Sequence, residues 1–249
     1  MDDYINNYDS YNEKIVYNFL LGDGGIGDCI KFFMFILESC IKNNKRLYYK
    51  INNIEIEKYI KLKYDKMYID ECAIKQLDCT TIATPQMFYS SVDYNYSINI
   101  NEVFYFTDEV KINCSKLFPL DITNYISIHL RLGDKYLETD KNCVLVPHDA
   151  RGYCEEKIYR YIEDNDDKNI FFCCDNSTYK NKIKTKYNKL IISNCDVGHT
   201  SLSNTTQKQI LDAITEFYIL TQSEIIYAGS TSGFSVVASK FCNIPLIVI

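Results

Sequence analysis

The chain has 249 residues and a hydrophobic fraction of 47%, which suffices for one large domain or two small ones and excludes a disordered protein. Its net charge of -6 provides no basic excess for binding nucleic acid. Eleven cysteines without a C-x-x-C pair and three histidines give no zinc-site spacing, so we expect reduced thiols and no metal.

The first part of the chain predicts a βαβ unit. We expect a strand over 13–21, a glycine-rich turn over 22–28, a helix from about 28 to 43 and a strand over 46–51. No apolar run has the length of a membrane span, and the acidic, polar start excludes a signal peptide. We therefore expect a cytoplasmic protein without a membrane span.

The residues of the glycine-rich turn allow two interpretations. Gly22, Gly24 and Gly27 have the spacing G-x-G-x-x-G, which is typical of dinucleotide-binding folds. That fingerprint also needs an acidic residue at the end of the second strand, which here ends in Tyr-Lys-Ile-Asn-Asn. A dinucleotide oxidoreductase is therefore a minor alternative. The turn can also serve only to let helix and strand pack closely.

The rest of the first half is less regular. Short strands are predicted over 67–69 and 80–83, followed by a helix over 101–117. A turn-rich segment begins at Pro119 and marks the best domain boundary, which gives an N-terminal domain of residues 1–120.

In the second domain, residues 121–249, strands and helices alternate. Strands are predicted over 125–130, 169–174, 190–193, 224–227 and 246–249, and helices over 155–163, 177–187, 206–222 and 233–241. Strict alternation indicates an α/β fold in which helices cover both faces of a parallel sheet.

The strand over 125–130 carries the most informative polar residues. His129 and Arg131 are two residues apart, so both side chains lie on one face just before Gly133 ends the strand. Open α/β sheets bind ligands at such strand ends. The planar, permanently charged fork of an arginine suits a diphosphate. Two solvated polar residues at a strand end are the plainer alternative.

Two later segments are predicted to reach the same sheet edge. Asp175 follows a buried strand, and its carboxylate can accept bonds from a guanine edge or ribose hydroxyls, or cap the next helix. Ser230 begins a Ser-Thr-Ser-Gly-Phe-Ser turn into a helix, where free N–H groups and the helix dipole favour an anion. Asp164-Asn-Asp is a nominal D-x-D, but it precedes its strand and is predicted to be a solvated loop on the opposite edge.

Together these segments resemble a known family. His129-Leu-Arg-Leu-Gly-Asp-Lys is similar to the His-x-Arg-x-x-Asp signature of the α1,2-, α1,6- and protein O-fucosyltransferases, and the segments beginning at Phe171 and Tyr227 resemble the family's second and third motifs. The resemblance implies a GT-B fold, in which two Rossmann-like parallel-sheet domains face a cleft. It also implies inverting, metal-independent transfer of fucose from GDP-fucose to a glycan or other hydroxyl acceptor, with no cofactor.

The resemblance also suggests roles for residues. Arg131 would bind the β-phosphate of the donor, and His129, Lys135 and Glu138 are further catalytic candidates. Glu138 and Asp140 straddle the position of the acidic residue in the α1,6 branch, so the base stays open. The donor-binding candidates are Gly25, Gly27, Asp28, Asp134, Asp175, Asp212, Ser230, Thr231, Ser232, Gly233, Phe234 and Ser235.

Two other functions are considered. A heptosyltransferase-like GT-B enzyme would share the Gly-Asp turn and the Ser-Gly turn but lack the His-x-Arg strand. A non-catalytic module would bind a sugar nucleotide or glycan without turnover. His148 and His199 are expected in loops, with His148 close enough to the signature to line the cleft. We also expect that Arg131, at a strand end, adds little to stability.

Overall fold

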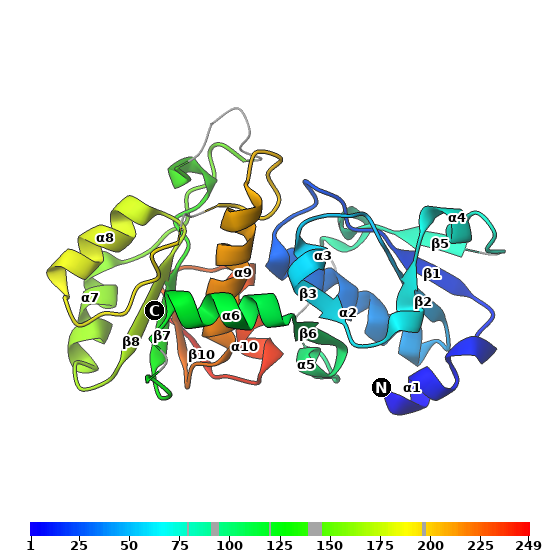
Figure 1. Cartoon of the computed structure of the whole chain (residues 1–249), viewed down its shortest axis with the longest axis horizontal. Coiled ribbons are helices and arrows are strands. Elements are labelled where there is room, and N and C mark those ends of the chain that lie inside the picture. Colours follow the sequence, from blue (N-terminus) through cyan, green and yellow to red (C-terminus); the bar gives the residue numbers. More distant parts are fainter. Residues whose placement is uncertain (79, 91–94, 120, 139–145, 196–197) are drawn as a thin grey trace.

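The computed structural model describes residues 1–78, 80–90, 95–119, 121–138, 146–195 and 198–249. Two parallel sheets lie side by side along the long axis of the molecule, each with helices packed around it (Figure 1). Across these described ranges, no helix combines the length and apolar character needed to cross a membrane.

The first sheet confirms the predicted βαβ unit. Its order is β4-β2-β1-β5 and its pairings are parallel. The strands are β1 (Lys14–Tyr17), β2 (Arg46–Lys50), β4 (Tyr68–Ile69) and β5 (Thr80–Ala83). Helix α2 (Ile26–Lys42) connects β1 to β2 and buries apolar residues along most of its length. The first strand is shorter than predicted, because the chain leaves the sheet after Tyr17 to form the glycine-rich turn.

Short elements surround this sheet. The helices and 3-10 turns are α1 (Asp2–Asn6), η1 (Tyr8–Ser10), α3 (Ile56–Tyr59), η2 (Asp65–Met67), α4 (Glu71–Ile74) and η3 (Pro85–Phe88). Strand β3 (Ile60–Leu62) pairs antiparallel with β6 (Phe104–Phe106).

The prediction of one helix over 101–117 was wrong. The segment forms α5 (Ile100–Val103), then β6, then α6 (Asp108–Leu117). Phe104 and Phe106 are buried while Tyr105 between them is exposed, which is the alternation of a strand. Antiparallel pairing with β3 overrides the helical periodicity at this point.

The second sheet is also parallel, in the order β10-β9-β7-β8. Its strands are β7 (Ile126–Leu130), β8 (Ile170–Cys174), β9 (Ile226–Ala228) and β10 (Leu246–Val248). The helices and the 3-10 turn are η4 (Asp134–Tyr136), α7 (Glu155–Asp164), α8 (Ser177–Lys186), α9 (Gln207–Thr221) and α10 (Gly233–Phe241). The predicted alternation is confirmed, and β7 is buried along its whole length near the centre of the sheet.

The predicted strand over 190–193 does not form. Only Ile191 makes a parallel bridge, to Phe171 of β8. The chain then leaves the sheet edge, and Ser193 and Cys195 turn inward to contact the buried carboxylate of Glu216. These polar contacts replace continued strand pairing.

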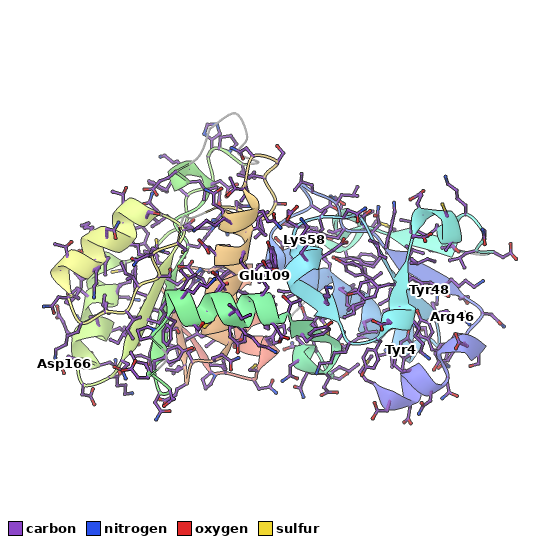
Figure 2. All side chains as sticks on the ribbon, viewed as in Figure 1. Tyr4, Arg46, Tyr48, Lys58, Glu109 and Asp166 are labelled. Carbon is purple, nitrogen blue, oxygen red and sulfur yellow. The ribbon has the colours of Figure 1, made fainter. Side chains whose placement is uncertain are left out.

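One hydrophobic cluster extends through both halves of the molecule. It includes Phe33 of α2, Phe171 of β8, Phe217 of α9 and Val237 of α10. Figure 2 shows Lys58 of α3 and Glu109 of α6 where the two halves meet. The predicted domain boundary at residue 120 stays a prediction, because this cluster crosses it.

Candidate functional site

A cavity of about 170 Å³ lies between the two halves. Its walls come from the start of α2, the ends of β7 and β8, residues 198–200 before α9, one face of α9, and the start of α10. The predicted residues that it brings together are Gly25, Gly27, Asp28, His129, Arg131, Asp175, Ser232, Gly233 and Phe234.

Arg131 is the central cation of this cavity. Its side chain is 15% exposed, and its two terminal nitrogens contact different carboxylates. Nη1 lies 2.8 Å from Asp175, and Nη2 donates to Asp134. The guanidinium is thereby fixed in one plane at the end of β7, which is the arrangement that bidentate recognition of an anion requires.

Asp175 holds both the guanidinium and the turn after β7. Its carboxylate accepts N–H bonds from Leu132 at 2.7 Å and from Gly133 at 3.1 Å. Gly133 has a φ of 103°, a conformation that suits glycine, and this turn directs both amides toward Asp175. Burial raises the pKa of Asp175, while the charge of Arg131 and the two amides oppose that rise. The structure thus places Asp175 as a support for Arg131, and its predicted contact with the nucleotide stays a prediction.

The N-termini of α2 and α10 meet at the cavity. A Cβ on Gly27 would lie 2.7 Å from the carbonyl carbon of Gly233, so only glycine allows this approach. Ser232 caps α10 by accepting from the Phe234 N–H at 3.2 Å. Each helix N-terminus carries a partial positive charge, and two such ends in contact favour an anion between them.

Two buried serines of the serine-rich turn hold the end of β7 and the start of α10 in place. Ser230 is buried, accepts from the backbone N–H of Arg131 at 3.0 Å and donates to its carbonyl at 2.7 Å. Ser235 is also buried and donates to the Ser232 carbonyl at 3.2 Å. Thr231 is exposed. Ser230 and Ser235 therefore position the strand end and the helix start.

His129 lies in the cavity wall, and one nitrogen of its ring lacks a hydrogen-bond partner among the described residues. Its side chain is only 3% exposed and stacks on Phe234 at 5.2 Å between ring centroids. Its Nδ1 is buried and has no partner among the described residues. Burial lowers its pKa to about 4, and the charge of Arg131 acts in the same direction. A buried, unpaired nitrogen costs roughly 1–3 kcal/mol, which a bound group can recover.

The predicted residues that lie outside the cavity wall include three that remain to be placed, namely Glu138, Lys135 and Asp212. Glu138 caps α8, accepting from the N–H groups of Ser177 and Thr178 at 2.9 Å. Burial raises its pKa, but these hydrogen bonds outweigh burial and leave it lowered, which disfavours a general base. Lys135 is exposed, with Nζ 5.6 Å from the Tyr136 ring centroid.

Asp212 is the third of these residues. It accepts from the Asn113 side chain at 3.0 Å and pairs with Lys208 at 2.6 Å, so it links α9 to α6. Ala213 and Glu216 are the α9 residues that line the cavity. The two oxygens of Asp212 hold these partners, and its predicted donor-binding role stays a prediction.

Asp134 also holds Arg131 in place. One of its oxygens contacts the guanidinium, and the other accepts from the Val146 N–H at 3.3 Å. Asp140 lies outside the described residues. His148 is exposed and does not line the cavity. Figure 2 shows Asp166 of the D-x-D segment at the outer end of the second half, far from the junction.

Sequence reasoning missed several residues of the cavity. His199 and Thr200 come from the loop before α9, and Arg151 adds a second cation that is 44% exposed and paired with Asp149 at 3.0 Å. The clustering of His199 with two hydroxyl residues was the available signal for the loop. Nothing in the local sequence distinguishes Arg151 from a surface residue.

Glu216 was also missed. It is a buried carboxylate, and Lys180 pairs with it at 3.1 Å. Cys195 donates to it at 3.0 Å and Cys173 at 3.4 Å. Burial raises its pKa, but the charge of Lys180 and the hydrogen bonds from Ser193 and Cys195 bring it below its usual value. Glu216 is therefore a buried carboxylate whose charge Lys180 balances, and it forms part of the cavity wall.

Within the ranges that the structure describes, no group of three or more histidine, cysteine, aspartate or glutamate side chains has a metal-binding arrangement.

The overall fold matches solved structures of GDP-fucose-dependent fucosyltransferases. The NodZ alpha-1,6-fucosyltransferase soaked with GDP-fucose matches with a TM-score of 0.55 and 9% identity over 92% of each chain. The POFUT1 apo-form gives 0.53 and 9% identity over 96% of this chain and 98% of that one. Arabidopsis thaliana FUT1, a mutant in complex with GDP, gives 0.57 and 9% identity over 99% of this chain and 74% of that one.

These likenesses establish the class of fold. The chain has the α/β architecture of the GT-B fucosyltransferases, with two sheets of parallel strands, and the predicted fold class is confirmed. The sequence matches no protein-family model and no curated protein. Several of the matching structures contain GDP or GDP-fucose.

Proposed function

We propose that the chain is a glycosyltransferase that transfers fucose from GDP-fucose to a hydroxyl acceptor, with inversion and without a metal ion. The observation that carries this proposal is the convergence of Arg131 with the N-termini of α2 and α10 on one cavity. A diphosphate is the anion that such a site suits, and the matching fold belongs to enzymes that use a GDP-linked sugar.

The electrostatics of the site explain why both halves are needed. Arg131 carries one positive charge, but Asp134 and Asp175 contact it with two negative ones. The guanidinium alone therefore cannot attract a diphosphate. The N-termini of α2 and α10 supply the remaining positive potential, and they reach the same cavity from both halves.

In the proposed reaction, the bond from fucose C1 to the β-phosphate oxygen breaks, and the phosphate oxygen keeps the electron pair. An acceptor hydroxyl oxygen forms a new bond to C1 from the opposite face, which inverts the anomeric configuration. Its proton passes to water, because burial and the charge of Arg131 lower the pKa of His129 to about 4 and make that ring a weak base. Arg131 and the N–H groups at the two helix starts stabilise the charge that grows on the departing GDP, as a cation would in a metal-dependent enzyme.

Nucleotide binding and turnover test this proposal. Thermal shifts should show stabilisation by GDP and none by UDP, ADP or NAD at equal concentration. Consumption of GDP-fucose should then be followed with varied glycans and by release of GDP. A shift with ADP-heptose in place of GDP would instead indicate a heptosyltransferase-like enzyme. A GDP shift without sugar consumption across all acceptors would indicate a binding module.

A further inference from the structure

A short loop of the second half is attached to the glycine-rich turn of the first half. Thr200 Oγ1 accepts from the backbone N–H of Ile26 at 3.2 Å. Ser201 Oγ accepts from the backbone N–H of Gly24 at 3.1 Å. These two bonds fix His199, which precedes them in the chain, relative to the start of α2.

The ring of His199 has a defined orientation and tautomer. Its Nδ1 accepts from the Ser201 backbone N–H at 3.2 Å, so that nitrogen carries no proton. The proton of the neutral ring therefore lies on Nε2. An ideal Cβ on Gly25 would be 3.7 Å from Cε1 and 3.8 Å from Nε2, so this ring edge faces the start of α2.

The Nε2–H group is available to a ligand. Within the part of the chain that the structure describes, Nε2 forms no hydrogen bond with a protein acceptor. His199 of the second half and Gly25 of the first half both line the cavity, and Arg131 lines it too. The ring is half-buried and lines the cavity, so its Nε2–H is accessible to an acceptor bound there.

The ring stays uncharged at neutral pH. Burial lowers the pKa of His199 to about 4, and the charge of Arg131 acts in the same direction, while Asp134 and Asp28 oppose it. In this tautomer Nε2 is a donor and has no lone pair for a proton. His199 therefore cannot act at Nε2 as the general base of a transfer reaction.

We infer that His199 donates its Nε2–H to an oxygen of the diphosphate bound in the cavity that Arg131 also lines. The inference rests on the proposed function for the identity of the nucleotide. The hydrogen bond itself requires only that the ligand carries a diphosphate. The hydrogen bonds of Thr200 and Ser201 to the glycine-rich turn hold the His199 ring in place. His199 can therefore donate to the diphosphate only while these two bonds connect the loop before α9 to that turn. His199 thus makes diphosphate binding depend on contact between the two halves.

Binding measurements with two probes test this inference. Isothermal titration with GDP and with inorganic pyrophosphate should show about tenfold weaker binding, or more, for His199→Phe, since a hydrogen bond to a charged group is worth roughly 1.5–3 kcal/mol. Affinity for guanosine should stay unchanged, because guanosine lacks the diphosphate. His199→Gln keeps a side-chain N–H donor and should recover part of the loss. The matched control is His148→Phe, an exposed histidine that does not line the cavity, and it should bind like the unsubstituted protein.

The outcomes separate this inference from the proposed function. If GDP binds and His199→Phe binds it equally well, or loses guanosine affinity to the same degree, the inference is wrong and the proposed function stands. If pyrophosphate binds in a His199-dependent way and GDP gives no tighter binding than UDP, the inference stands and the proposed nucleotide is wrong.

A second measurement tests the inference even if the His199→Phe variant does not fold, because it uses the unsubstituted protein. In the unsubstituted protein with ¹⁵N-labelled histidine, pyrophosphate should shift the Nε2–H proton resonance of His199 downfield. A resonance that stays unchanged at saturating pyrophosphate would overturn the inference.

Discussion

Replacing Arg131 with alanine should damage both folding and activity. Sequence reasoning expected little effect on stability, but the structure changes that expectation. Asp134 and Asp175 are buried on either side of the guanidinium, with side chains 8% and 9% exposed. In the alanine variant two buried carboxylates lose their shared counter-charge.

The size of the effect follows from this geometry. Breaking a buried ion pair by removing one partner costs about 3–5 kcal/mol. Asp175 keeps its two backbone N–H bonds, so we take the lower end, about 3 kcal/mol. For a chain of this length that corresponds to a drop in Tm of roughly 6–12 °C. Turnover should fall about 100-fold or more, the scale for losing one donor to the leaving group.

The assay separates the two effects. Tm is measured at pH 7.5 and pH 5, and GDP affinity and transfer are measured well below the Tm of the variant. Burial already raises the pKa of Asp175, and loss of Arg131 removes the charge that opposes this rise. The stability deficit should therefore shrink at pH 5, where protonation removes the repulsion. Arg131→Lys should recover part of the stability and less of the activity, because an ammonium lacks the planar fork.

Arg160→Ala is the control, since Arg160 is exposed on α7. It should change neither Tm nor transfer. An Arg131→Ala protein that melts like the unsubstituted one and transfers fucose at the same rate would refute both the ion-pair argument and the donor site.

Four further outcomes are expected. Gly27→Ala should lower Tm and GDP affinity, because its Cβ would meet the backbone at the start of α10, whereas Gly152→Ala, which meets nothing within 4 Å, should lower neither. Lys180→Met should cost about 3–5 kcal/mol by leaving Glu216 buried and unpaired, and adding Glu216→Gln should restore part of it, both measured by urea denaturation. EDTA should leave transfer within about twofold, since protein donors stabilise the leaving group. Because the pKa of His129 is lowered to about 4, the unfolded chain binds more protons below pH 6.5, so this residue alone should lower stability by up to about 3 kcal/mol as the pH drops to 4, and His199 should add a loss in the same direction.

Each outcome has a result that would contradict it. A Gly27→Ala protein with normal GDP affinity would show that the two helix starts need not touch. A Lys180→Met protein as stable as its double variant would mean that the carboxylate finds another partner. Loss of transfer in EDTA, restored by manganese, would require a metal. If His129→Phe showed the same loss of stability at acid pH as the unsubstituted protein, other groups would account for it.

The sequence predicted the second half of the molecule well, because its elements are long and alternate strictly. Strand β7 and the start of α10 lie where the patterns place them, and this is enough to bring Arg131 to a cavity. The break of the predicted 101–117 helix was not predictable, because it depends on pairing with β3, more than 40 residues earlier in the chain.

The residues that surround Arg131 were harder to predict from the sequence than Arg131 itself. Glu138 looked like a base by its distance from the signature, but its partners Ser177 and Thr178 are known only once α8 is placed. On α9, Asp212 and Glu216 differ by only about 40° around the helix axis. That small rotation decides which carboxylate faces α6 and which faces the cavity, and packing sets it, not the sequence pattern.

The hydrophobic cluster that crosses residue 120 limits how this molecule can be divided or recombined. Phe33 and Phe104 from the first half and Phe217 and Val237 from the second contribute to one interior. A fragment that ends at residue 119 would therefore expose the surface that its other half covers, and heat should unfold both halves in a single transition. A chimera with the first half of another GT-B protein would need compensating changes at this interior before it could bind anything. Substitutions at the junction are expected to accumulate in pairs, one in each half.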